Sequence, residues 1–151
     1  MEETEQEVEI TMYEVCLLHS RADRALRLVI ARHLDQFNVT LMEWLLMGAV
    51  NAGPKEGITM SAVAGALDVT LPQVTALTAS LTKAKLLKQK VSRKDRRSRR
   101  LVCTSAGKKM LQDIEKAADH GMKEWLSEIP EEQLEAYFST IKLLAERKPQ
   151  E

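Results

Sequence analysis

The sequence predicts a mainly α-helical fold with one small β-hairpin, arranged as a winged helix-turn-helix. Three features of the 151-residue chain indicate this class. Apolar residues recur with helical spacing over most of its length. Two short helical segments near the middle are joined by a tight turn. A pair of strands with a strongly basic tip follows them at once, which is the winged-helix order of elements.

The length corresponds to one domain, or to one domain with a helical extension. An apolar share of 44% is enough for a core, which aliphatic residues must fill because aromatic residues make up only 4%. No run of about 18 apolar residues predicts a membrane span. The acidic N-terminus does not resemble a secretory or organellar signal. Two distant cysteines, Cys16 and Cys103, favour a reducing compartment, so we expect a soluble, cytoplasmic protein.

A long first helix is predicted from about Thr4 to Asp35, a stretch without Gly or Pro. Its apolar residues recur at steps of three and four and spill over more than one stripe. A surface helix needs only one buried stripe. The excess indicates a second covered side, which another subunit can provide. The repeating positions are Val8, Met12, Val15, Leu18, Ala22, Ala25, Leu28 and Val29.

The second helix is predicted to begin at a capping box, in which Thr40 is the N-cap and Glu43 lies three residues later. Gly53 is expected to end it in a left-handed C-cap, with Pro54 as the stop. A short extended piece, Ile58 to Met60, follows. Ser61 is then expected to cap a third helix of about two turns.

The fourth helix is predicted from about Leu71 to Ala84, behind a second capping box of Thr70 and Gln73 with Pro72 in the first turn. Together with the third helix and the Asp-Val-Thr turn, it forms a helix-turn-helix or, alternatively, a plain αα-hairpin. Its predicted buried residues are Val74, Leu77 and Leu81. Its other face is small and polar: Gln73, Thr75, Ala76, Ala79, Ser80 and Lys83.

The stretch Lys83 to Arg100 holds ten Lys or Arg residues and one acid, Asp95. The chain has 22 basic and 22 acidic residues in total, so the remainder is as acidic as this stretch is basic. Strands are predicted at Leu87 to Val91 and Leu101 to Thr104, which puts residues 92–100 at a positive tip. This charge pattern indicates a polyanionic partner, with nucleic acid as the first candidate.

In a winged helix the second helix of the motif enters the major groove, and the hairpin reaches the flanking backbone or the minor groove. Arginine suits a narrow minor groove because the negative potential is enhanced there. Asp95 lies two residues before Arg97 and either orients it through an ion pair or initiates a turn. Both alternatives remain open at this point.

Two more helices follow the hairpin. Thr104 is predicted to cap the fifth, and Pro130 with Glu131 and Glu132 is predicted to open the last. Both ends of the chain are therefore apolar-faced helices, which a twofold dimer would cover. We expect a single chain, 1–151, with a helical dimerisation region at 4–37 and 105–148 and a DNA-binding winged helix-turn-helix at 39–104.

From Val39 to Gly107 the chain resembles the MarR family of bacterial transcriptional regulators. Asp95, Arg97, Thr104 and Gly107 fall on the family pattern, which is Asp-x-Arg in the wing and then Leu-Thr-x-x-Gly. The resemblance implies a homodimer formed by the terminal helices in a bacterial or archaeal cell. It also implies a palindromic duplex operator, minor-groove contact by Arg97, a repressor more often than an activator, and a small aromatic or phenolic effector.

Three positions depart from the family pattern. Lys85 stands where a glycine usually follows the recognition helix, so that helix is expected to end differently. Ala76 stands where many members place an arginine that touches DNA. Base readout is therefore expected either to be weaker or to rest on Gln73, Thr75 and Ser80. Cys103 replaces the usual leucine of the second wing strand.

The candidate DNA-binding residues lie on the fourth helix and the wing: Thr70, Pro72, Gln73, Thr75, Ala76, Ser80, Lys83, Lys94, Arg96, Arg97 and Arg99. Their cations would neutralise phosphates and make binding salt-dependent. By the resemblance, an effector would lie between the dimer helices and the DNA-reading part. Its candidate lining is Leu18, His19, Trp44, Met47 and Met110, each of which can equally be plain core.

Cys16 lies where some family members carry a peroxide-sensing thiol, but a structural cysteine is the simpler interpretation. Cys16 and His19 are one turn apart, yet no further cluster completes a metal site. No nucleophile-and-base motif or phosphate-binding loop predicts catalysis, and no cofactor is expected. Two alternatives to a ligand-gated regulator stay open. One is a redox-sensing regulator using Cys16, and the other is a winged helix that binds proteins.

Overall fold

The computed structural model describes residues 10–91 and 99–147. Its fold is mainly helical with one antiparallel hairpin, which confirms the predicted class. The elements are α1 (Met12–Leu34), the short 3-10 helix η1 (Asp35–Phe37), α2 (Leu41–Ala52), α3 (Met60–Leu67), α4 (Leu71–Lys83), β1 (Leu87–Val91), β2 (Arg99–Cys103), α5 (Ser105–Trp125) and α6 (Glu131–Glu146).

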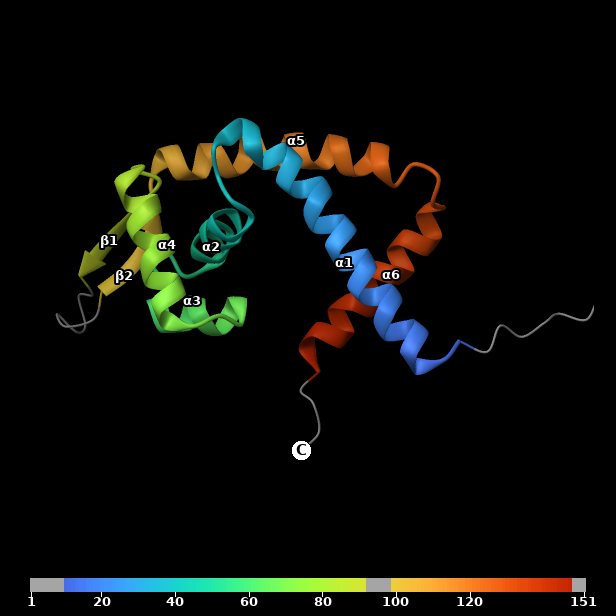
Figure 1. Ribbon diagram of the computed structural model, residues 1–151. Coiled ribbons are helices and arrows are strands. Elements are labelled where there is room, and N and C mark those ends of the chain that lie inside the picture. Colours follow the sequence, from blue (N-terminus) through green and yellow to red (C-terminus); the bar gives the residue numbers. More distant parts are fainter. Residues whose placement is uncertain (1–9, 92–98, 148–151) are drawn as a thin grey trace, which may run out of the picture.

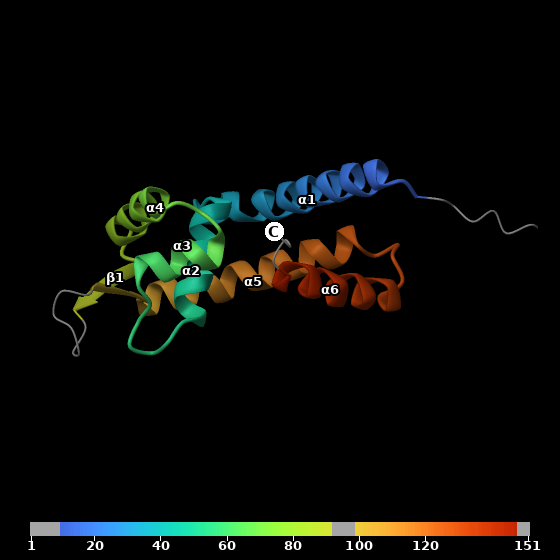
Figure 2. The same ribbon diagram turned by 90° about the horizontal axis from the view of Figure 1, so that it is seen from below.

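The long helix α5 joins two parts of the molecule (Figure 1). One part, called the lobe below, consists of α2, α3, α4 and the β1–β2 hairpin and lies at the N-terminal end of α5. The other consists of α1 and α6 at the far end of α5. Seen from below, α1 and α6 lie in separate layers, and α4 is at the outer edge of the lobe (Figure 2).

The lobe contains the main hydrophobic core. Val74, Thr78 and Leu81 of α4 are buried at the i, i+4 and i+7 spacing of one helical face. Leu77, which was predicted to join them, is only partly buried. The buried cluster they face consists of Leu46, Met47, Val50, Val63, Ala64, Leu86, Leu87, Leu101 and Cys103.

The turn between α3 and α4 makes a helix-turn-helix rather than a plain αα-hairpin. The two helices meet at 111°, within the range of about 90–120° that is typical of this motif. Asp68 takes the left-handed conformation at the end of α3, and the amide of Val69 bonds to the Ala64 carbonyl. The predicted Thr70–Gln73 capping box is present at the start of α4.

The end of α4 uses a lysine where the turn favours glycine. Lys85 has φ +60°. Its amide bonds to the Thr82 carbonyl, and the amide of Leu86 bonds to the Leu81 carbonyl. This pair of bonds is a Schellman motif, which needs a left-handed residue at the position of Lys85. Lys85 therefore adopts the backbone conformation that a glycine would take in this turn.

The Leu86 carbonyl ties this turn to α5. It accepts hydrogen bonds from the backbone amide of Thr104, at 3.0 Å, and from its hydroxyl, at 3.1 Å. The same hydroxyl caps α5 by accepting from the amide of Gly107, as predicted. A Cβ at Gly107 would approach the Leu86 carbonyl oxygen to 2.2 Å, so only glycine fits there.

The hairpin pairs Leu87 with Cys103 and continues to Val91 and Arg99. The second strand thus begins at Arg99 and ends at Cys103, not at 101 and 104 as predicted, because Thr104 serves as the N-cap of α5. Ile58 adds a short bridge to Leu101 on the other edge of β2.

Three helix ends also differ from the sequence predictions. Residues 10 and 11 are not helical, because Thr11 and Glu14 form a capping box at the start of α1; the rest of its predicted first part lies outside the described residues. Thr59, not Ser61, caps α3. Gly53 has φ −74°, so the C-cap of α2 is extended rather than left-handed, and its amide bonds to the nearby Val50 carbonyl.

Helices α1 and α6 leave most of their apolar residues in solvent. Leu34 is the one buried residue of α1, and α6 has none. Of the fifteen exposed large apolar side chains in the described residues, all but Leu71 and Val91 lie on α1, α6, the end of α5 or the adjoining segments. No single helix in the described ranges is long and apolar enough to cross a membrane.

Candidate DNA-binding surface

The candidate surface begins with the outer face of α4, defined here as Thr70, Pro72, Gln73, Thr75, Ala76, Ser80 and Lys83. All seven residues are exposed. They stay in solvent because the opposite face of the helix packs into the lobe core. The face carries hydroxyls, one amide, two compact apolar side chains and a cation in the last turn, so a convex rod with small projections results. Such a surface fits the width of a major groove.

Several polar groups of this face are already engaged within the chain. The Gln73 side-chain oxygen accepts from the amide and hydroxyl of Thr70, both at 2.9 Å. The Thr75 hydroxyl donates to the Leu71 carbonyl at 2.9 Å. The Gln73 side-chain amide therefore presents its N–H donors outward, while its oxygen holds the helix start. These bonds fix the rotamers of the two side chains before any partner binds.

The Ser80 hydroxyl donates to a carboxylate oxygen of Glu43 at 2.7 Å. Glu43 also accepts from the amide and hydroxyl of Thr40, so the same carboxylate caps α2 and holds α4. Burial alone would raise the pKa of Glu43, but the hydrogen bonds from Ser80 and Thr40 lower it below its ordinary value. The carboxylate is thus an ionised clamp between two helices of the lobe.

The basic residues of the hairpin divide into two groups. Lys88, Lys90 and Arg99 are exposed, and Arg99 makes only a long contact, 3.4 Å, to the Gln89 side chain. Arg100 instead donates to the Gly57 carbonyl at 2.9 Å and so braces the α2–α3 loop. The candidates Lys94, Arg96 and Arg97, together with Asp95, lie outside the described residues.

Two features of this surface were not singled out from the sequence. Leu71 occupies the first position of α4 and is 46% exposed, although leucine is a residue type that is often buried. The first residues of a recognition helix are the ones that approach base edges, and an apolar side chain there can contact a thymine methyl group. The β1 lysines are the second feature, because strand alternation puts Lys88 and Lys90 on one face.

Comparison with known proteins bears on this part of the chain. Residues 37–98 match the model of the MarR family. The similarity to that family lies in the helix-turn-helix and the start of the hairpin. The match runs from the end of η1 through the outer face of α4 and into the hairpin. Among curated proteins, none matches the chain.

Several solved structures share the fold over most of the chain. A transcriptional regulator (MarR family) from Rhodococcus sp. RHA1 has a TM-score of 0.81 at 16% identity, covering 88% of this chain and 93% of that one. CouR from Rhodococcus jostii RHA1, bound to p-coumaroyl-CoA, has 0.78 at 17%, covering 91% and 96%. MepR of S. aureus in a DNA complex has 0.73 at 24%, covering 87% and 97%.

The five residues predicted to line a MarR-family effector site do not gather in one cavity of the chain. Met47 is fully buried in the lobe core, and Met110 packs against that core. Leu18 is 55% exposed on α1, and His19 lines a cleft between α1 and α6. Trp44 lines two neighbouring clefts, one against α3 and α5 and the other against α5 and α6.

The two cysteines occupy different environments. Cys16 is exposed on α1, whereas Cys103 is buried. The Cys103 thiol lies 3.5 Å from the Met47 carbonyl, and burial raises its pKa while the charge of Lys108 opposes that effect. Cys103 therefore fills the core position that leucine usually takes. In the part of the chain that the structure describes, no three His, Cys, Asp or Glu side chains form a metal-binding group.

Proposed function

We propose that the protein is a homodimeric transcriptional regulator, most simply a repressor, that binds a palindromic duplex operator in the cytoplasm and is gated by a small molecule. The observation that carries the proposal is the solvent-facing polar side of α4, the second helix of a helix-turn-helix. The packing of Val74, Thr78 and Leu81 holds that side outward, next to a basic hairpin. The dimer and the effector site are argued below from separate observations.

In the proposed complex, the outer face of α4 enters the major groove. The Gln73 side-chain amide and Leu71 are nearest to the bases, since they lie in the first turn. Lys83 at the end of α4, Arg99 in β2 and the wing candidates Lys94 and Arg96 contact phosphates, which supplies affinity without sequence information. The wing candidate Arg97 reaches into the minor groove. The MepR–DNA complex among the structural relatives supports this assignment.

Dimerisation is proposed through α1 and α6, because their exposed apolar side chains need a cover. Met12, Leu18 and Leu144 are each more than half exposed. A cleft of about 320 Å³ between α1, the end of α5 and α6 is lined mainly by apolar side chains, including Leu26 and Phe138. In a twofold symmetric contact, the same patch of each subunit is buried against its partner. The symmetry also places the two lobes opposite the two half-sites of a palindromic operator.

The effector site is proposed beside Trp44, in a cleft of about 620 Å³ that also borders Phe138. Four carboxylates line it, from Glu115, Asp119, Glu131 and Glu135, against the single cation Lys123, which is paired with Asp119 at 2.7 Å. Acidic walls with aromatic faces suit a cationic aromatic compound better than a phenolate. The p-coumaroyl-CoA complex of CouR supports a small-molecule ligand in this fold.

The DNA proposal is tested with genomic duplex fragments captured by the protein and then titrated by fluorescence anisotropy. Lys83→Gln should reduce the log–log salt slope by about 0.9 per contact, so about 1.8 for a dimer. Gln73→Ala should reduce the difference in binding free energy between captured and random duplexes by about 1–3 kcal/mol. The controls Lys116→Gln and Gln112→Ala on α5 should change neither. Wild-type protein without affinity for any duplex at low salt would overturn the proposal.

The dimer proposal is tested by sedimentation equilibrium. Leu18→Glu puts a charge into the proposed interface and should give monomers with weak operator affinity. Leu71→Glu places the same charge on the exposed start of α4 and should leave the dimer intact while abolishing operator binding. Monomeric wild-type protein, or a Leu18→Glu variant that still dimerises fully, would contradict this interface.

The effector proposal is tested by quenching of tryptophan fluorescence with phenyltrimethylammonium and, separately, with benzoate. The cation should bind more tightly, and Trp44→Leu should remove the response while Trp125→Leu keeps it. Tighter binding of benzoate would show that the carboxylates do not define the ligand.

A further inference from the structure

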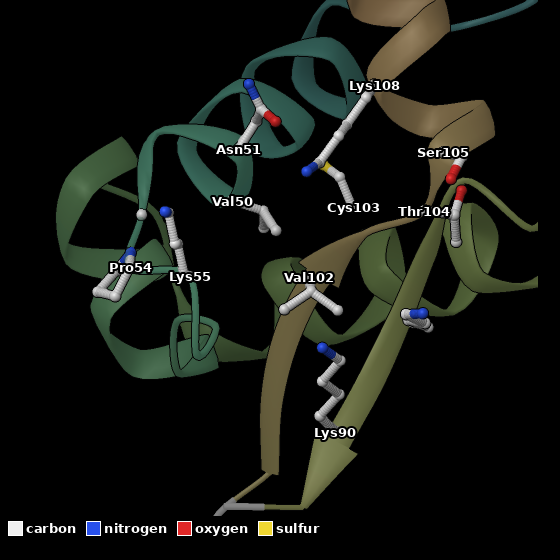
Figure 3. Close-up of a pocket in the computed structure, with 12 residues that line it drawn as sticks. Val50, Asn51, Pro54, Lys55, Lys90, Val102, Cys103, Thr104, Ser105 and Lys108 are labelled. Atoms are coloured by element: carbon white, nitrogen blue, oxygen red, sulfur yellow. The ribbon is translucent and has the colours of Figure 1, made fainter.

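Another cleft, of about 330 Å³, lies away from α4, between the C-terminal end of α2, the outer side of the hairpin and the first turn of α5. None of its twelve lining residues belongs to α3 or α4. Figure 3 shows Lys55, Lys90 and Lys108 standing around Val102, each from a different segment of the chain.

The cleft concentrates positive charge. Lys55, Lys88, Lys90 and Lys108 all line it, and no Asp or Glu is among the lining residues. The ion pairs found in the described ranges involve other cations, namely Arg27, Lys109 and Lys123. Four like charges around one cavity repel one another. A bound anion would remove this repulsion, whereas an apolar ligand would not.

The rest of the lining suits a phosphate ester. Ser105 contributes a hydroxyl at the first position of α5, where the positive end of the helix dipole also favours an anion. Pro54 and Val102 supply a small apolar patch that a bare ion would leave uncovered. The cavity volume falls in the lower part of the range of small-ligand sites, about 300–1,000 Å³.

We propose that this cleft binds a small phosphorylated compound, with its phosphate among the four lysines and its organic part on the apolar patch. A phosphate of the DNA backbone is the other source of the same chemistry. A small compound is favoured because the site is concave and none of its lining residues lies on α3 or α4. Lys88 and Lys90 are shared with the candidate DNA-binding surface, so the test below separates the two sources. The proposal stands independently of the function of α4.

The test uses inorganic pyrophosphate as the probe, titrated calorimetrically into the full chain at an ionic strength held constant with potassium chloride. Wild type should bind saturably, with about one pyrophosphate per chain. Lys55→Gln/Lys108→Gln, which leaves the hairpin untouched, should bind at least about tenfold more weakly. The control Lys116→Gln/Lys142→Gln removes the same charge from α5 and α6 outside the cleft and should bind like wild type.

Two results would overturn the proposal. The first is pyrophosphate binding that does not saturate, or that both double variants weaken equally, because net charge alone would then explain it. The second is an absence of pyrophosphate binding combined with a DNA salt slope that falls by about 0.9 per lysine in Lys55→Gln/Lys108→Gln. That outcome would assign the cleft to the DNA backbone.

Discussion

The Ser80 hydroxyl on α4 and the Glu43 carboxylate on α2 lie 2.7 Å apart and form a hydrogen bond that joins the two helices. Glu43 stands in a capping box, a local motif, yet its second oxygen reaches a helix 37 residues further along the chain. The orientation of the candidate recognition helix therefore depends partly on the cap of another helix. Ser80 is already committed to this bond and is better placed to hold α4 than to read a base.

Ser80→Ala should lower the free energy of unfolding by about 0.5–1.5 kcal/mol at pH 7, since it deletes one solvent-exposed hydrogen bond. The folded pKa of Glu43 is depressed, so the ionised clamp contributes above its ordinary pKa of 4.5 and is lost as pH falls through the lower folded value. The difference in the free energy of unfolding between wild type and Ser80→Ala should therefore become smaller below about pH 4. Urea unfolding of both proteins at pH 7 and below about pH 4 measures this difference. Ser61→Ala, which removes an exposed hydroxyl elsewhere, is the control. A gap independent of pH would contradict the clamp.

Lys85→Gly should stabilise the protein by about 1 kcal/mol, because Lys85 holds a left-handed backbone, φ +60°, that glycine adopts without strain. Both Schellman hydrogen bonds are made by the backbone and stay in place. Thermal unfolding shows whether Lys85→Gly raises or lowers the stability. Lys83→Gly, two residues earlier within α4, should destabilise by about 1 kcal/mol. If both variants are destabilised to the same extent, glycine at position 85 relieves no backbone strain.

Gly107→Ala should destabilise the protein by about 2 kcal/mol or more, since its Cβ would meet the Leu86 carbonyl oxygen at 2.2 Å and backbone would have to move. Gly65→Ala is the matched control within α3, where an added Cβ meets nothing within 4 Å. That variant should be more stable by about 0.5–1 kcal/mol. Equal effects of the two changes would show that the contact between the α4 turn and α5 is loose.

Thr78→Val should stabilise the protein by about 1 kcal/mol. The Thr78 side chain is 1% exposed, and its hydroxyl has no hydrogen-bond partner in the described structure. A buried hydroxyl without a partner costs desolvation free energy that a methyl group of the same shape avoids. Chemical denaturation measures the change, with the exposed Thr82→Val as the comparison. A destabilised Thr78→Val variant would mean that the hydroxyl has a partner, such as a bound water.

The sequence alone was sufficient for the order of elements, the fold class and the exposed side of α4. These follow from local rules, because capping boxes at Thr40 and Thr70 and the spacing of Val74 and Leu81 act within a few residues of the chain. Helix ends were less predictable. Gly53 is the C-cap of α2, but its backbone is extended rather than left-handed. Ser61 suits an N-cap, but the Thr59 hydroxyl caps α3 instead.

Tertiary structure alone decided which partners meet across the chain. The bond from Ser80 to Glu43, the fit of Gly107 against Leu86, the use of Arg100 to hold the Gly57 loop and the gathering of four lysines beside α5 all join segments that are far apart in sequence. Periodicity and capping carry information over one or two helical turns. Which charges share a cleft depends on how the helices cross, and helix crossings are set by the packing of the whole core.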